Sequence, residues 1–336
     1  MRAITILLIF VYGFLLFPAA NAQYRPDTLG NGYFSRTIEQ PDDYEGKVVC
    51  TLIKKEKLAG SNKAVLYVHG YNDYFFQTQL GDSLNTWGYN FYAVDLRKYG
   101  RSLLPNQDMF FCKDISEYFA DIDTCLSIIK AEGNNDVYLM GHSTGGLTLS
   151  AYLNSGSLNC SGIKGLILNS PFLDWNLGFV LEKLAVPIIS FIGGCYPNFV
   201  VMKYDHPTYA YTLLKAFKGE WTYNTDWKKP EGHPKKAGWI RAIEQAQNKL
   251  MEHSDIQCPV LILSSDKSTM ATKEWQEIYT ESDIVLSVED IKKFGITLGK
   301  ETEYHAIAKG VHDLILSRKE SRQETYRTIH SWLEKH

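Results

Sequence analysis

DVYLMGHSTGG, residues 136–146, is the part of the sequence that says most about the architecture of this chain. Its first five residues, four of them apolar, have the length of a strand, and 147–153 begins a helix. Between them Gly141, Ser143 and Gly145 make a G-x-S-x-G pattern. Such a turn strains the serine backbone and brings neighbouring elements too close for side chains, so glycine flanks the serine. We predict a nucleophilic Ser143; the alternative is a glycine-rich turn with an idle serine.

Strand-like and helical segments alternate on both sides of this stretch. We expect helices at 75–87, 114–132, 147–153 and 319–334, and strands at 48–53, 64–68, 90–95, 136–140, 163–168, 259–264 and 302–308. This alternation predicts an α/β fold with a mostly parallel central sheet flanked by helices. The pattern stops at 172–255, which is rich in aromatic residues, prolines and helical runs. We interpret 172–255 as an inserted helical cap on a core formed by 23–171 and 256–336.

A nucleophilic serine needs a base, and the base needs an orienting acid. His312 follows the last expected strand within the turn GVHD, where its imidazole reaches the carboxyl edge of the sheet. Asp266 follows the apolar run PVLILSS directly and is the predicted acid; its alternative role is a solvated turn residue. Asp283, Asp290 and Asp313 compete with it. The predicted order along the chain is nucleophile, acid, base.

The oxyanion that forms on attack needs backbone N–H donors. The amide of Thr144, directly after the nucleophile, is the first expected donor. The amide of Tyr71, in the loop after His69 and Gly70, is the second. We interpret His69 as structural and not as a second base.

Six segments together resemble the serine aminopeptidase and monoacylglycerol lipase-like (lysophospholipase-like) group of α/β hydrolases. They are VLYVHGYNDYFFQ (65–77), DLRKYGRS (95–102), GHSTGG (141–146), SPFLDW (170–175), PVLILSSDKS (259–268) and GVHDL (310–314). The resemblance implies the α/β-hydrolase fold and puts the triad on Ser143, Asp266 and His312, with oxyanion amides at Tyr71 and Thr144. By the same resemblance, Asp95 and Arg97 lie in a supporting turn. The chain departs from the group in an extra segment near 282–299.

The group includes lipases, lysophospholipases, carboxylesterases and some peptidases. We therefore expect hydrolysis of a carboxylic ester, such as a monoacyl lipid, lysophospholipid or small ester, through an acyl-serine intermediate. An aminopeptidase is the alternative; it needs an acidic pocket, for which Glu182, Asp205 and Glu220 are conceivable. A third alternative, a binding protein that has lost catalysis, does not fit a chain that keeps all three triad residue types. No metal cluster or cofactor fingerprint occurs, so we expect neither group.

The N-terminus has the pattern of a secretory signal peptide. Arg2 precedes an apolar run at 4–17, and the A-x-A pattern at 20–22 predicts cleavage after Ala22. This indicates a secreted or periplasmic protein. The run is shorter than the roughly 20 residues that span a bilayer. In an exported chain the six cysteines permit disulfides, and their pairing stays open.

Charge and hydropathy restrict the partners. The formal net charge of −3 and the pI of about 6.3 argue against nucleic-acid binding. The stretch 177–194 in the cap is strongly apolar, with only Glu182 and Lys183 charged. It is interpreted either as the cap's own core or as a lid that guides an acyl chain and transiently contacts a membrane surface. The sequence gives no indication of an oligomeric state.

Overall fold

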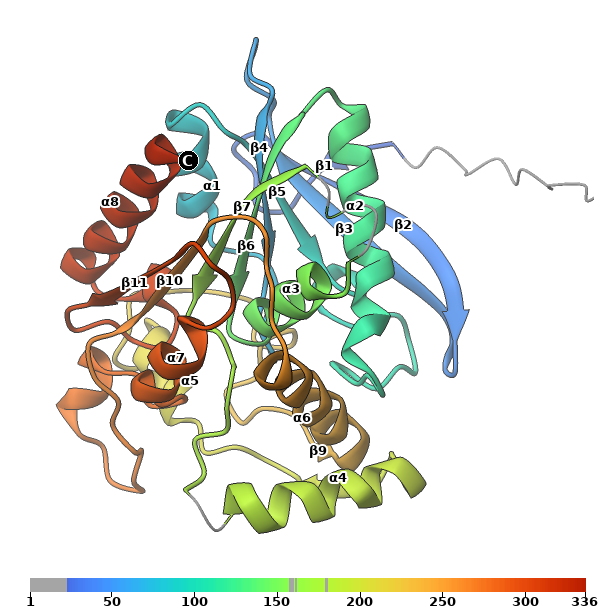
Figure 1. Cartoon of the computed structure of the whole chain (residues 1–336), viewed down its shortest axis with the longest axis vertical. Coiled ribbons are helices and arrows are strands. Elements are labelled where there is room, and N and C mark those ends of the chain that lie inside the picture. The colour runs from blue at the N-terminus through green and yellow to red at the C-terminus, as the bar shows by residue number, and fades with distance from the viewer. Residues whose placement is uncertain (1–22, 157–159, 161, 179–180) are drawn as a thin grey trace, which may run out of the picture.

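The computed structural model describes residues 23–156, 160, 162–178 and 181–336 (Figure 1). The predicted signal peptide, residues 1–22, lies outside the described residues. The helices in the described part of the chain are all too short or too polar to cross a bilayer.

A mostly parallel sheet forms the centre of the molecule. Within the described residues nine strands pair in the order β1-β2-β3-β5-β4-β6-β7-β10-β11. The strands from β5 to β11 in this order are parallel, whereas β2 and β3 form an antiparallel hairpin beside β5. The strands are β1 (Arg25–Pro26), β2 (Tyr33–Asp43), β3 (Gly46–Lys55), β4 (Lys63–Val68), β5 (Asn90–Asp95), β6 (Asp136–His142), β7 (Ile163–Asn169), β10 (Val260–Ser265) and β11 (Thr302–Ile307). The predicted fold class is confirmed.

Helices cover both faces of this sheet (Figure 1). Helices α1 and α8 pack on one face, and α2 and α3 pack on the other. The helices outside the cap are α1 (Thr78–Thr86), α2 (Phe119–Ala131), α3 (Thr144–Asn154), α7 (Val288–Gly295) and α8 (Lys319–Lys335). The sequence pattern predicted α1, α2, α3 and α8, and it indicated a helix-like segment around Asp290, where α7 lies.

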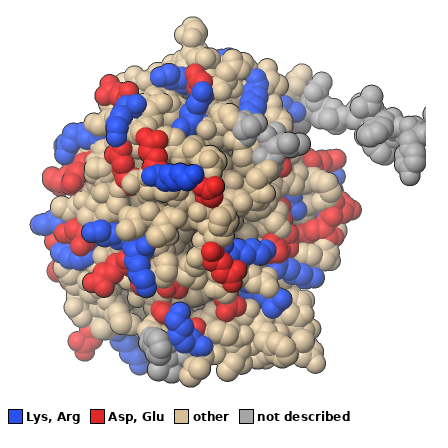
Figure 2. Space-filling model, viewed as in Figure 1, with Lys and Arg blue, Asp and Glu red and all other residues tan. Residues whose placement is uncertain are grey.

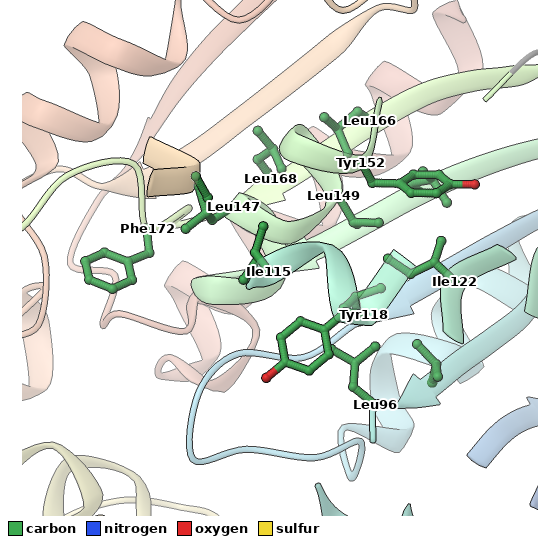
Figure 3. Close-up of a cluster of buried hydrophobic side chains, with 14 of the residues drawn as sticks. Leu96, Ile115, Tyr118, Ile122, Leu147, Leu149, Tyr152, Leu166, Leu168 and Phe172 are labelled. Carbon is green, nitrogen blue, oxygen red and sulfur yellow. The ribbon is translucent and has the colours of Figure 1, made fainter. Parts of the chain in front are cut away.

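The buried strands place successive side chains in two separate cores, because side chains alternate between the faces of a strand. On β4, Val65 and Tyr67 join the core under α1 and α8, whereas Leu66 and Val68 join the core under α2 and α3. Part of the second core is shown in Figure 3, where Leu147 and Leu149 of α3 meet side chains from several other elements. Burying one such side chain fully contributes roughly 1.5–3 kcal/mol.

The chain between β7 and β10 contains α4 (Val186–Cys195), β8 (Val200–Met202), α5 (Thr208–Leu213), β9 (Lys235–Lys236) and α6 (Ala237–Glu252). We call this part the cap. Helix α6 lies between α4 and the sheet domain and contacts both α4 and α3 (Figure 1). The backbones of α4 and α6 touch: a Cβ added at Gly193 would lie 2.3 Å from the carbonyl oxygen of Ala237. Glycine is therefore required at this contact.

Helix α4 has one buried face and one apolar face in solvent. Val186 and Gly193 face the cap interior, while Ile188 and Phe191 are 60% and 73% exposed. The apolar stretch 177–194 is therefore only partly the cap's own core. Figure 2 shows acidic and basic side chains interspersed over the visible face, with an uncharged margin at the lower right edge, where Figure 1 places α4.

Candidate active site

Ser143 occupies a strained turn between the end of β6 and the start of α3. Its φ is +52° and its ψ is −118°, a conformation that side-chain-bearing residues rarely adopt. A Cβ at Gly141 would lie 2.7 Å from the carbonyl oxygen of Gly145, and a Cβ at Gly145 would lie 2.4 Å from that of His69. The glycines of the G-x-S-x-G pattern are thus required by close backbone approach, as the sequence predicts.

His312 lies in the loop after β11, at the same carboxyl edge of the sheet as Ser143. Its Nδ1 is 2.9 Å from Oδ2 of Asp283, and both side chains are buried. The imidazole ring is centred 5.0 Å from that of His142, the residue before Ser143. Within the described residues no hydrogen bond joins the Ser143 hydroxyl to His312. Such bonds are often long before substrate binds, and they shorten in the complex.

The pairing of His312 with Asp266 expected from the sequence is wrong. Asp266 is exposed, and its carboxylate accepts a hydrogen bond from the backbone N–H of Lys309 at 3.0 Å. Of the other competitors, Asp290 lies in the first turn of α7. Asp313 is buried, but its Oδ1 accepts a hydrogen bond from Asn169 Nδ2. Asp283, and not Asp266, makes the contact with His312 that we expected of the acid.

The chain reaches Asp283 by an excursion that starts and ends at the same place. After β10 the segment 269–282 leaves the sheet and returns, so that Ser268 and Asp283 form an isolated parallel bridge. Asp283 N–H donates to the carbonyl of Lys267, and Thr269 N–H donates to the carbonyl of Asp283. Asp283 therefore lies beside the end of β10, where we expected the acid from the sequence. In the sequence, however, it comes well after β10.

The carboxylate of Asp283 is held from both sides. Its Oδ1 accepts hydrogen bonds from the N–H groups of Val285 and Leu286, both at 2.8 Å. Its Oδ2 faces His312. With Nδ1 of His312 donating to this carboxylate, Nε2 is left as the nitrogen that can accept a proton.

The two expected oxyanion donors lie beside Ser143. Thr144 is the first residue of α3, so its N–H has no partner within the helix. Tyr71 follows Gly70, where an added Cβ would lie 3.1 Å from the Cβ of Ser143. The loop after β4 thus passes close enough to Ser143 to point backbone N–H groups at a bound carbonyl oxygen.

His69 uses both ring nitrogens for the backbone. Its Nδ1 is 2.8 Å from the carbonyl oxygen of Gly70, and its Nε2 accepts from the N–H of Leu96 at 3.1 Å. Burial lowers the pKa of His69, which keeps the ring neutral. The interpretation of His69 as a structural residue agrees with these contacts.

The supporting turn after β5 is held by buried ion pairs. Asp95 accepts from the N–H of Phe75 and pairs with Arg101 at 2.8 Å. Arg97 pairs with Asp121 at 2.7 Å. The bond from Phe75 to Asp95 thereby ties the loop after β4, which contains Tyr71, to this turn.

The family model described as "Serine aminopeptidase, S33" matches residues 59–319. The chain belongs to the serine aminopeptidase S33 family. No curated protein matches the sequence with significant similarity.

Solved structures show that this S33-family chain has the α/β-hydrolase fold. A soluble variant of the Saccharomyces cerevisiae monoglyceride lipase, in complex with a substrate analogue, is 20% identical, with a TM-score of 0.62 over 89% of this chain and 95% of that one. The Paleococcus ferrophilus monoacylglycerol lipase is 19% identical, with a TM-score of 0.58 over 80% and 93%. Mouse alpha/beta hydrolase domain-containing protein 10 is 14% identical, with a TM-score of 0.56 over 89% and 98%.

Beside Tyr71, this S33-family chain has a cavity of about 250 Å³. Its walls are largely aromatic and include Phe110, Phe111 and Trp239. Its charged side chains are Asp108, Lys229 and Lys236, and Lys236 is paired with Asp108. His233 is also part of the lining; burial, together with the charge of the nearby Lys229, lowers its pKa to about 4.

Proposed function

We propose that this protein is a serine hydrolase that cleaves carboxylic esters through an acyl-serine intermediate. The observation that carries the proposal is the 2.9 Å contact between His312 Nδ1 and Asp283 Oδ2, beside a serine with a strained backbone. This is the combination of base, orienting acid and presented hydroxyl that a serine nucleophile requires.

In the acylation step the Ser143 hydroxyl attacks the ester carbonyl carbon while Nε2 of His312 takes its proton. Asp283 stabilises the imidazolium that forms. The amides of Tyr71 and Thr144 donate to the oxyanion, and each such donor contributes about 10²–10³ in rate. His312 then gives its proton to the leaving alcohol. In the second step water, activated by the same imidazole, releases the acid and restores the serine.

The charges near the site favour an ester over a peptide with a free amino group. The cavity beside Tyr71 carries two lysines and one aspartate, which disfavours an ammonium group there. Each of the three acidic cap residues considered for binding an amino group already has a partner. Asp205 pairs with Lys235, Glu220 pairs with Arg322, and Glu182 accepts from the N–H of Leu177. We therefore rank an aminopeptidase second.

The test of this proposal uses the mature protein on p-nitrophenyl esters of increasing chain length, alongside aminoacyl-p-nitroanilides. We expect ester hydrolysis that Ser143→Ala abolishes, and labelling by a fluorophosphonate that the same substitution prevents. Equal activity or labelling in wild type and Ser143→Ala would refute Ser143 as the nucleophile, whereas a wild type with neither activity nor labelling would favour a non-catalytic binding protein. Faster turnover of the anilides would support the aminopeptidase instead.

We further propose that the protein is exported and that α4 contacts a lipid surface while the site works. Export is supported by the signal-peptide pattern ending at Ala22. Lipid contact is supported by the exposed large side chains Ile188 and Phe191 of α4 and Leu184 of the π-helical turn Leu181–Ala185 directly before it. Protein in the culture medium or periplasm whose N-terminal sequence begins at Gln23 would support export with cleavage, and protein found only inside the cell with its N-terminus intact would refute it.

A further inference from the structure

Two loops from different parts of the chain meet next to Ser143. The first, which we call the oxyanion loop, is residues 70–76 after β4. The second, which we call the cap loop, is residues 224–233 in the cap. Asn72 of the oxyanion loop bonds the backbone of Lys229 twice: its Nδ2 donates to the carbonyl at 2.8 Å, and its Oδ1 accepts from the N–H at 3.0 Å. The cap is thus tied directly to the segment that carries the Tyr71 amide.

A second contact joins the same loops two residues further along the oxyanion loop. The hydroxyl of Tyr74 accepts a hydrogen bond from the N–H of Asn224 at 2.8 Å. The ring of Tyr74 is centred 5.1 Å from that of Trp227. These contacts lie on either side of Lys228 in the cap loop. The side chain of Lys228 is buried against the oxyanion loop.

Lys228 forms a buried ion pair with Asp73. Its ammonium is 3.0 Å from Asp73 Oδ1, and the two residues are only 5% and 0% exposed. Burial alone would raise the pKa of Asp73, but the charge of Lys228 and the neighbouring His142 together hold that pKa well below its usual value. Asp73 therefore remains a carboxylate, and its charge is balanced by a residue of the cap.

The same pair lies against the nucleophile and the base. Oδ2 of Asp73 is 3.5 Å from Nδ1 of His142, the residue before Ser143. The Lys228 ammonium is 5.9 Å from the centre of the Tyr209 ring, and that ring is centred 5.6 Å from the imidazole of His312. One cation of the cap is thus packed among the oxyanion loop, the nucleophile turn and the base.

A metal ion is the other cation that this cluster would suit. Asp73, His142 and Asp313 are buried, and each offers a ligand atom within 4.8 Å of the others. However, Lys228 already supplies a positive charge at Asp73, and Asp313 Oδ1 is bonded by Asn169. A divalent ion would have to displace or repel the ammonium. The observations therefore favour lysine as the cation of this cluster.

We propose that Lys228 is a positioning residue that holds the oxyanion loop against Ser143 through Asp73. This inference rests on the proposed serine hydrolase function. Removing the ammonium leaves a buried carboxylate without its cation, and the loop must move to bring that carboxylate to water or to a proton. Because a misplacement of about 1 Å near the reacting atoms can cost about 10²-fold in rate, the loss falls on kcat and not on ground-state binding.

The experiment compares four variants on one p-nitrophenyl ester, with thermal unfolding measured for each. Lys228→Met is expected to lower kcat by about 10- to 100-fold with KM changed by less than about 3-fold. Lys215→Met, an exposed lysine elsewhere in the cap, is the matched control and should match wild type. Asp73→Asn combined with Lys228→Met removes both charges and should regain about 10-fold over Lys228→Met alone. Ser143→Ala should be inactive.

The outcomes separate the inference from the function on which it rests. A Lys228→Met enzyme with kcat within about 2-fold of wild type overturns the positioning role. So does a double variant no faster than Lys228→Met, or a loss that vanishes when rates are corrected for the folded fraction. If wild type and Ser143→Ala hydrolyse the ester equally, the proposed function fails and the inference fails with it.

Discussion

Asp283→Asn is the substitution that most directly tests the site, because the structure fixes how the new amide must lie. The Asp283 Oδ1 accepts from two backbone N–H groups, those of Val285 and Leu286. The asparagine oxygen must keep these bonds, since turning the NH₂ group toward them would leave two buried donors unpaired at about 1–3 kcal/mol each. The NH₂ group then faces His312 and forces its Nδ1 to accept.

A proton on Nε2 follows from that forced tautomer, so the imidazole cannot take the proton of Ser143. The expected loss in kcat is about 10⁴-fold, which corresponds to about 5.5 kcal/mol in the activation free energy. The KM should change little, because Asp283 is buried behind His312 and faces away from the reacting atoms.

The assay is steady-state hydrolysis of a p-nitrophenyl ester, with Asp266→Asn as the matched control. Asp266 is exposed, and an asparagine oxygen can still accept from Lys309, so this variant should stay within about 0.5 kcal/mol of wild type, or roughly 2-fold in rate. If Asp266→Asn caused the large loss and Asp283→Asn did not, the assignment of the acid from the structure would be refuted.

Four further substitutions test other parts of the structure. His233→Gln should reduce the fall in the free energy of unfolding between pH 7 and pH 5 by up to about 2 kcal/mol. The reason is that the folded pKa of about 4 lies below the unfolded value, so that only the unfolded state gains a proton as the pH falls; urea unfolding with an unchanged pH dependence would contradict it. Gly165→Ala should destabilise by about 1–3 kcal/mol, because its Cβ would lie 2.5 Å from the Trp332 ring. Gly194→Ala, whose Cβ has only the end of the Arg241 side chain at 3.5 Å, should unfold at or above the wild-type temperature in the same thermal melts. Phe191→Ser should weaken co-sedimentation with phospholipid vesicles without changing turnover of a short soluble ester, and unchanged sedimentation would speak against lipid contact by α4.

The positions of Ser143 and His312 were predictable because each follows a strong local pattern. The G-x-S-x-G turn needs its glycines for reasons of close approach, and these reasons act within a few residues of the chain. His312 could be located because β11 ends shortly before it. In both cases the residue closely follows a strand, so that its place at the carboxyl edge of the sheet can be inferred from local sequence.

Asp283 could not be located in the same way, because its place depends on a contact between residues far apart in sequence. An aspartate directly after β10 is the natural expectation, and Asp266 satisfies it. The extra segment beginning near residue 282 was the available signal, since added residues between the strand and the base allow the acid to come from later in the chain. Only the bridge between Ser268 and Asp283 shows where those residues return.

The β2–β3 hairpin and the role of Lys228 were also beyond the sequence pattern. The strand β2 alternates polar and apolar residues only weakly, and its pairing with β3 supplies the missing signal. In KKPEGHPKK, residues 228–236, every lysine looks like a solvated surface charge. Burial of Lys228 beside Asp73 depends on how the cap folds back over the core, which no local pattern encodes.

The closed base of the 269–282 excursion makes this loop a natural place to graft new sequence. Its two ends are pinned together by the backbone bonds among Lys267, Thr269 and Asp283. Extra residues at an exposed position such as Lys273 would therefore lengthen only the far end of the loop. Doubling a flexible loop costs only about 0.6 kcal/mol in closure entropy. A peptide tag or a recognition segment inserted there should be displayed at the rim of the site while the carboxylate that serves the imidazole keeps its position.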